Sequence, residues 1–147
     1  MFDIEKSIGF LLAKAHQRGV ALFSEEIGRY DLTPPQFGVL AFLWQKDGLT
    51  QTELSEKTQI DRTTLCGLLD RMERACLLER RPHPQDRRAH LVFLSKKGKA
   101  LEPELTGIAQ QTLEKFTAGL SDGDLNELTR MLEILRGERK AYATFAA

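Results

Sequence analysis

The side chains in this sequence that could carry covalent chemistry are few and widely spaced. The 147 residues include three histidines and two cysteines. No nucleophile is paired with a base, no glycine-rich loop could cradle a phosphate, and His16, His83, His90 and Cys76 have no zinc-site spacing. We therefore expect no enzyme, no metal site and no cofactor.

The chemistry that the sequence does suggest is electrostatic. The net charge is zero, but residues 71–99 hold nine Lys or Arg against three acidic residues, a net of +6. The other 118 residues carry a net charge of −6. A basic block on an acidic body is typical of a nucleic-acid-binding protein, although it would also suit an acidic protein partner.

Length and composition indicate an ordinary soluble protein of one domain or two closely shared ones. Hydrophobic residues make up 41% and charged residues 29%. No apolar run reaches the roughly 18 residues that would span a bilayer, and the N-terminal residues do not resemble a signal peptide. We expect a cytoplasmic protein that does not enter the membrane.

Helix signals divide the first half of the chain. Apolar residues at helical spacing predict an amphipathic first helix of about 28 residues that ends near Gly28. A second helix begins after Thr33, where two prolines occupy the first turn, and ends before Asp47.

Two further helices follow with a tight turn between them. Thr50, with Glu53 three residues later, predicts a capping box at the start of a short helix. Residues 58–60 form the turn, and Asp61 caps a longer helix that runs to about residue 75. This arrangement predicts a helix-turn-helix.

The pattern then changes to strand and returns to helix. Residues 77–81 and 90–94 are β-prone, and the turn-forming residues 82–86 lie between them, so they predict a β-hairpin with a basic tip, called a wing. Ser95 caps a helix that reaches Phe116, and a leucine-striped last helix begins at Ser121. The fold class is mainly α with a small β-hairpin wing.

The predicted helix from residue 61 to 75 has two faces. Leu65, Leu68, Leu69, Met72 and Cys76 form a core-facing stripe. Cys66 and Cys76 are ten positions apart on this helix, roughly 15 Å along its axis, which is too far for a disulfide.

The opposite face could meet DNA. Thr63 and Thr64 lie in the first turn, where a recognition helix contacts base edges, and Arg62, Arg71 and Arg74 could neutralise phosphates. Gly67, in mid-helix, either allows close approach of DNA or is a neutral surface position.

The wing tip is the most specific local signal. Arg87 could enter a minor groove, and Asp86 could hold a neighbouring arginine through a paired contact. The alternative is a solvated hairpin loop whose charges do little.

Residues 32–101 resemble the multiple-antibiotic-resistance regulator (MarR) family of bacterial transcription factors. The matching segments are LTPPQF from Leu32, TQ-x-EL from Thr50 and LLDRME from Leu68. The wing string LERRP-x-P-x-DRRA from Leu78 is specific, and LS-x-x-G from Leu94 completes the match.

The resemblance implies a homodimer that binds pseudo-palindromic double-stranded operators, usually as a repressor that a ligand releases. Residues 1–30 and 96–147 would form a helical dimerisation domain around a winged helix-turn-helix at 31–95. Independently, the apolar stripes of the terminal helices exceed what so small a domain can bury alone.

The family's DNA contacts carry over onto residues 50–52, Thr63, Thr64 and Arg87. Family members often have a pair such as Thr-Arg where this chain has Cys66-Gly67, which leaves its base preference open. The complete predicted set is Thr50, Gln51, Thr52, Arg62, Thr63, Thr64, Cys66, Gly67, Arg71, Arg74, Arg87 and Arg88.

Three regulatory readings follow. The family's common effectors are organic molecules, often aromatic acids, in a cleft between the two parts of the protein. Alternatively, Cys66, near a helix N-terminus and Arg62, could sense oxidation, or the winged helix could contact another protein. The candidate ligand contacts are His16, Arg18, Phe23, Phe37 and Trp44.

Overall fold

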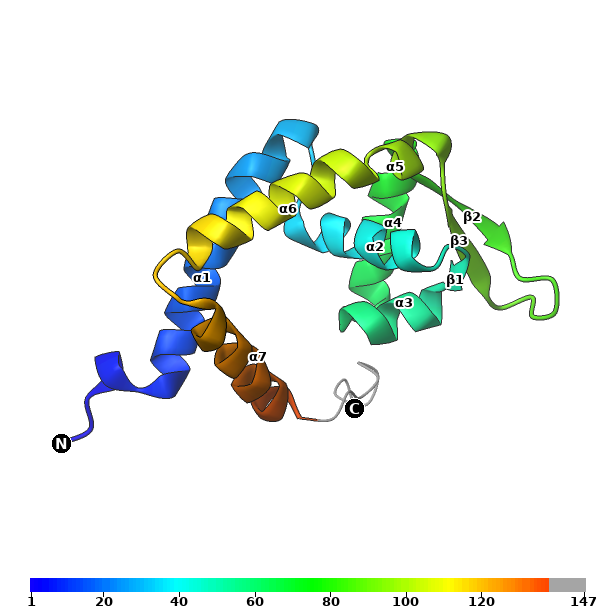
Figure 1. Ribbon diagram of the computed structural model, residues 1–147. Helices are drawn as coiled ribbons and strands as arrows, with labels where there is room; N and C mark the ends of the chain where they lie inside the picture. Colours follow the sequence, from blue (N-terminus) through cyan, green and yellow to red (C-terminus); the bar gives the residue numbers. More distant parts are fainter. Residues whose placement is uncertain (138–147) are drawn as a thin grey trace.

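The computed structural model describes residues 1–137 and shows a helical protein with one small sheet (Figure 1). The N-terminal part comprises η1 (Ile4–Lys6), α1 (Ile8–Ile27) and η2 (Gly28–Tyr30). The central elements are α2 (Pro34–Gln45), β1 (Leu49–Thr50), α3 (Gln51–Thr58), α4 (Arg62–Arg74), β2 (Leu78–Pro82) and β3 (His90–Leu94). The chain continues through α5 (Lys96–Ala100), α6 (Glu102–Phe116) and α7 (Asp122–Arg136).

The elements form two groups. Figure 1 shows α6 lying across α1, with α7 beyond them, while α2, α3, α4 and the sheet gather at the other end of α6. The hairpin of β2 and β3 projects away from the helices. The winged helix-turn-helix class is therefore confirmed.

The predicted helix starts in the central part are confirmed. The Gln36 side chain accepts a hydrogen bond from the Thr33 backbone N–H at 3.0 Å, and α2 begins with the two prolines. The Thr50 hydroxyl accepts from the Glu53 N–H at 3.0 Å. The reciprocal contact from the Glu53 carboxylate is not formed, so Thr50 provides only half of the predicted capping box.

The sheet has one strand more than the sequence indicated. Its order is β1-β3-β2, and all pairs are antiparallel. β1 is only two residues long, with Leu49 opposite Val92 and Thr50 opposite Leu91. So short a strand has no alternation for a sequence pattern to detect, and Thr50 serves both as a strand residue and as the cap of α3.

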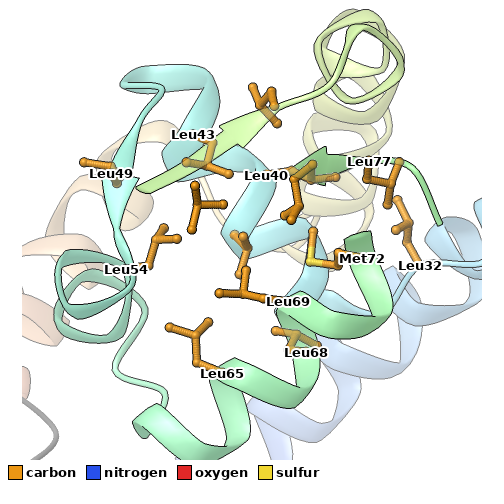
Figure 2. Close-up of a cluster of buried hydrophobic side chains, with 14 of the residues drawn as sticks. Leu32, Leu40, Leu43, Leu49, Leu54, Leu65, Leu68, Leu69, Met72 and Leu77 are labelled. Atoms are coloured by element: carbon orange, nitrogen blue, oxygen red, sulfur yellow. The ribbon is translucent and has the colours of Figure 1, made fainter. Parts of the chain in front are cut away.

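A leucine-rich core joins the helices to the sheet (Figure 2). The stripe of α4 is buried as predicted at Leu65, Leu68, Leu69 and Met72. Full burial of a side chain of this size contributes about 1.5–3 kcal/mol, so this stripe fixes which face of α4 remains outside. The other core residues are Ile27, Leu32, Val39, Leu40, Leu43, Leu49, Leu54, Leu77, Leu78, Val92, Leu94 and Leu105.

The prediction for Cys76 is wrong. This residue lies beyond the C-terminal cap of α4, has a φ of 60° and is exposed. Its backbone N–H donates to the Glu73 carbonyl at 3.0 Å, which closes the last helical turn. A residue in the left-handed region ends an α-helix and turns its side chain away from the stripe.

The two long predicted helices are each interrupted. The Ser7 hydroxyl donates to the Ile4 carbonyl at 2.7 Å and accepts from the Phe10 N–H at 3.3 Å, so α1 starts at residue 8. Competing side-chain bonds of this kind favour a cap over helix interior. The helix predicted from Ser95 to Phe116 breaks at Leu101, because Pro103 would clash with the Lys99 carbonyl in a continuous helix.

Two findings for residues 1–137 concern the membrane-spanning helix and the metal site that the sequence does not predict. None of the helices is long and apolar enough to cross a bilayer. No group of three or more His, Cys, Asp or Glu side chains is placed to bind a metal ion.

The junction between α5 and the end of α4 gives a stability prediction. A Cβ on Gly98 would lie 2.2 Å from the Leu77 carbonyl oxygen, which is a backbone atom. Gly98→Ala is expected to lower the free energy of unfolding by roughly 1–3 kcal/mol, as overpacking usually does, measured by urea denaturation.

Gly107→Ala is the matched control. Gly107 lies within α6, and no atom is within 4 Å of the position of an added Cβ. This variant should keep the urea midpoint or raise it, since Ala is favoured over Gly in helices by up to about 1 kcal/mol. Equal stability of the two variants would contradict the close packing at Gly98.

Candidate nucleic-acid interface

The turn between α3 and α4 sets the direction of the recognition helix. Gln59 has a φ of 59°, which ends α3, and the Ser55 hydroxyl donates to the Ile60 carbonyl at 2.6 Å. Ser55 is itself buried. The turn is therefore held from within, and α4 leaves it with its leucine stripe on the core.

Asp61 caps α4 with both carboxylate oxygens. Oδ1 accepts the Thr64 backbone N–H at 2.8 Å, and Oδ2 accepts the Thr64 hydroxyl at 2.7 Å. These hydrogen bonds lower the pKa of Asp61, so the cap is ionised at neutral pH. The Thr64 hydroxyl proton is consequently engaged, which leaves its oxygen lone pairs and methyl group for an incoming ligand.

The outer face of α4 carries the other predicted contacts. Thr63, Cys66, Arg71 and Arg74 are exposed, and the two arginines form no ion pair within the described chain. Gly67 is half-buried, and a Cβ there would meet only the Arg71 Nη1 at 3.8 Å. The protein's own packing therefore does not require glycine at this position.

A hollow of about 150 Å³ brings together residues from three predicted segments. The first turn of α3 contributes Gln51 and Thr52, the start of α4 contributes Arg62, and the wing contributes Arg88 and His90. The backbone N–H groups of a first helical turn lack intrahelical acceptors. With two arginines beside them, these N–H groups form a site that suits an anion. Thr50, Leu65 and Ala89 complete the lining.

The wing tip is a tight turn held by backbone contacts. Asp86 Oδ1 accepts the Arg88 backbone N–H at 2.9 Å, and the Asp86 carbonyl accepts the Ala89 N–H at 3.2 Å. The predicted pairing of Asp86 with an arginine side chain is wrong, because its carboxylate serves the turn instead. Arg87 and Arg88 extend into solvent without an ion-pair partner among residues 1–137.

Arg80 makes structural contacts with α4 that were not predicted from the sequence. Its Nε and Nη2 donate to Glu73 Oε2 at 3.1 and 2.8 Å, and Nη2 also pairs with Asp70. The hydrogen bonds from Arg80 lower the pKa of Glu73. The sequence does contain a pattern that could have predicted this contact. Two acidic residues lie three positions apart on a helix, and an arginine follows on the inward face of the next strand.

A second, apolar cavity of about 250 Å³ lies between α1, α2 and α6. Two of the predicted ligand contacts line it, Phe23 and Phe37, whose rings meet edge to face at 4.9 Å. The remaining lining residues are Gly19, Ala109, Thr112, Leu113 and Phe116.

The other three ligand candidates do not line this cavity. Arg18 lies on its Phe116 wall, donating from Nη1 to the Phe116 carbonyl at 3.2 Å. Trp44 supports Phe37 from behind, with ring centroids 5.8 Å apart, and its Nε1 donates to the Gly98 carbonyl at 3.0 Å. His16 is exposed on α1 and is not among the lining residues.

These features define a winged helix-turn-helix protein with exposed arginines on α4 and the wing, at Arg62, Arg71, Arg74, Arg87 and Arg88. Comparison with known proteins agrees: the model of the MarR family matches residues 30–89. The HTH-type transcriptional repressor NicR of Pseudomonas putida is 34% identical over 92% of this chain and 84% of its own length. YsmB of Bacillus subtilis, an HTH-type transcriptional regulator, is 32% identical over 94% of this chain and 92% of its own.

Solved structures give the same result. Bordetella bronchiseptica BpsR, whose DNA binding is regulated by 6-hydroxynicotinic acid, aligns with a TM-score of 0.88 and 30% identity over 94% of this chain and 99% of its own. A mutant MarR from E. coli in complex with operator DNA aligns with a TM-score of 0.84 and 26% identity, over 92% and 99% of the two chains. The chain belongs to the MarR family and is a DNA-binding transcriptional regulator.

Proposed function

We propose that this protein is a homodimeric cytoplasmic repressor that a small aromatic acid releases from a pseudo-palindromic operator. In this proposal α4 enters the major groove, Arg87 enters the adjacent minor groove, and the aromatic cavity holds the effector. The observation that carries the proposal is the hollow that joins α3, α4 and the wing, since it gathers donors and cations from all three on one surface.

The hollow suits a phosphate of the DNA backbone. Phosphate contacts position a protein on a duplex, whereas contacts to base edges select the sequence. Gln51, Thr52, Arg62 and Arg88 would therefore fix the docking of α4. Thr63, whose hydroxyl has no hydrogen-bond partner in residues 1–137, is then the side chain best placed to read a base.

Unburied apolar surface supports the dimer. Of the 20 residues of α1, only Ile27 is buried, and α7 has no buried residue. Contiguous apolar surface on a soluble monomer is rare and marks an interface. A second copy covering it would define a dimerisation domain from residues 1–30 and 96–147, of which residues 138–147 lie outside the described structure. The exposed apolar side chains are Met1, Phe2, Ile4, Ile8, Leu11, Leu12, Val20, Leu113, Leu120, Met131, Leu132, Ile134 and Leu135.

The aromatic cavity supports a single-ring effector. Its walls are mostly apolar, with Phe23, Phe37 and Phe116 offering ring edges and faces to a planar ligand. Arg18, which already lies against Phe116, supplies a cation for a carboxylate. The relation to BpsR makes 6-hydroxynicotinic acid the first compound to test.

A chain of contacts leads from this cavity toward the wing. Phe37 meets Trp44, Trp44 donates to the Gly98 carbonyl, and Gly98 packs on Leu77, which precedes β2. An effector that displaced Phe37 would thus press on the residue from which the wing begins. Such a contiguous packed route is one physical way for a ligand to change DNA affinity.

DNA binding is tested with a duplex from the intergenic region upstream of the protein's own gene. Arg87→Ala should weaken binding by about 1–3 kcal/mol, or roughly 5- to 150-fold, because a minor-groove contact is lost. Gel shifts at several salt concentrations measure this change. The logarithm of the affinity should fall linearly with the logarithm of salt concentration, with a slope near −0.9 per phosphate contacted.

Arg29→Ala removes the same charge from η2, directly after α1, where Arg29 pairs with Glu26 at 3.4 Å. This control should bind within twofold of the wild type. Undetectable binding to every duplex at 50 mM salt would contradict DNA recognition by this surface, and an unchanged affinity of Arg87→Ala would remove the role given to the wing tip.

Effector release is tested with a variant that fills the cavity. Ala109→Phe places a ring in the space between α1, α2 and α6. The wild type should lose at least tenfold in DNA affinity with 6-hydroxynicotinic acid or another single-ring aromatic acid. Ala109→Phe should bind DNA without ligand but change less than twofold when the acid is added.

Ala118→Phe, outside the cavity lining, is the control and should respond as the wild type does. If Ala109→Phe responds fully, the effector binds elsewhere. A wild type that no aromatic acid releases from DNA would contradict this mode of regulation.

A further inference from the structure

Arg80 connects the wing to the recognition helix through an unusually complete set of contacts. Its backbone N–H donates to Glu73 Oε1 at 3.3 Å, while Nε and Nη2 both donate to Oε2. Nη2 also reaches Asp70, and Nη1 lies 3.9 Å from the Cys66 Sγ. One residue of β2 therefore touches three successive turns of α4, at positions 66, 70 and 73.

The position of Arg80 along β2 makes these contacts an anchor. Leu78 and Arg80 share one face of the strand, because side chains alternate, and Leu78 is already in the core. The hydrogen bonds of the hairpin beyond Arg80 lie within the hairpin itself, for example from the His83 N–H to the Ala89 carbonyl at 3.1 Å. In the described chain, Arg80 is thus the outermost hydrogen-bonded tie between β2 and α4.

The arrangement also removes an electrostatic obstacle. Asp70 and Glu73 are two negative charges on the recognition helix, where they would repel DNA phosphates. Arg80 draws both carboxylates toward the wing, and its hydrogen bonds keep the pKa of Glu73 low, so the contact remains ionic at neutral pH.

Arg80 is poorly suited to contact DNA itself. Its side chain is only 19% exposed, and Nε and Nη2 are occupied by carboxylates. Arg87 is exposed, and its side chain has no ion-pair partner in residues 1–137. Arg80 and Arg87, two of the four arginines of the wing, therefore differ in what they can do, although both lie in the same basic block of sequence.

We propose that Arg80 is a positioning residue for DNA binding: by tying β2 to Asp70 and Glu73, it holds the wing where Arg87 can reach the groove beside α4. The inference rests on the proposed DNA-binding mode. In this proposal, a substitution of Arg80 weakens DNA binding because Arg87 is no longer held in place, and not because Arg80 itself loses a contact with DNA. The effects of substituting the two residues on DNA affinity therefore cannot be independent.

A double-mutant cycle tests this coupling. Operator affinity is measured for the wild type, Arg80→Met, Arg87→Ala and the double variant. The factor by which Arg87→Ala weakens binding should be at least threefold smaller in the Arg80→Met background than in the wild type. Arg81→Met is the matched control, because Arg81 lies on the opposite face of β2, over the Phe93 ring at 4.3 Å and paired with Glu79. It should leave the Arg87→Ala factor unchanged.

A second measurement does not depend on DNA. Backbone 15N relaxation of the free protein should show larger amplitude motion of residues 83–89 in Arg80→Met than in the wild type or Arg81→Met. If Arg80→Met does not fold, Arg80→Lys replaces it in both measurements. Lysine keeps the charge but cannot donate from a planar fork to Glu73 and Asp70 together.

The outcomes are distinct. A reduced Arg87→Ala factor with a more mobile wing supports the positioning role. Independent effects of the two substitutions, or an equally rigid wing, overturn it even when the wild type binds its operator and Arg87→Ala weakens that binding. Failure of the wild type to bind any duplex overturns the proposed DNA-binding mode, and the positioning role with it.

Discussion

The structure depends on how the C-terminal end of α4 is closed. The last carbonyls of an α-helix have no partners within the helix, and leaving them unpaired while buried is costly. Here the Met72 and Glu73 carbonyls accept the Leu77 and Cys76 N–H groups at 3.0 Å, and the segment after the helix is tied to the far side of the wing. The Ser95 hydroxyl donates to the Cys76 carbonyl at 2.6 Å, and the Ser95 N–H donates to the Leu77 carbonyl at 3.0 Å. The hairpin must leave α4 and return to it, so the recognition helix and the wing form one unit.

The same junction places α5 and a wall of the aromatic cavity in contact with the segment that joins α4 to the wing. Gly98, one turn after Ser95, approaches Leu77 so closely that only glycine fits, and its carbonyl accepts the Trp44 Nε1 hydrogen. Trp44 in turn meets Phe37 of the cavity wall. The effector site that we propose is therefore connected to the start of the wing through packed residues, and a change at one site can be transmitted to the other through these contacts.

Local signals in the sequence predicted the central elements, because caps and turns are decided by neighbouring residues. Thr33, Asp61 and Ser95 start helices as expected, and the wing strands lie within one residue of their predicted bounds. The features that were missed depend on tertiary partners: β1 exists only by pairing with β3, and Arg80 is an anchor only because α4 presents two acids to it. The sequence predicts that Asp86 pairs with an arginine side chain, whereas in the structure it accepts the backbone N–H of Arg88. The break at Leu101 could have been predicted from Pro103.

The central claim is that α4 and the wing of each subunit in a dimer bind DNA together. A hydroxyl-radical footprint on the operator tests this claim most directly. Two symmetric protected regions should appear about one helical turn apart, between roughly 10 and 10.5 base pairs from centre to centre or a multiple of that, each flanked by a protected minor groove. A single protected region, or protection without the flanking minor grooves, would contradict the claim.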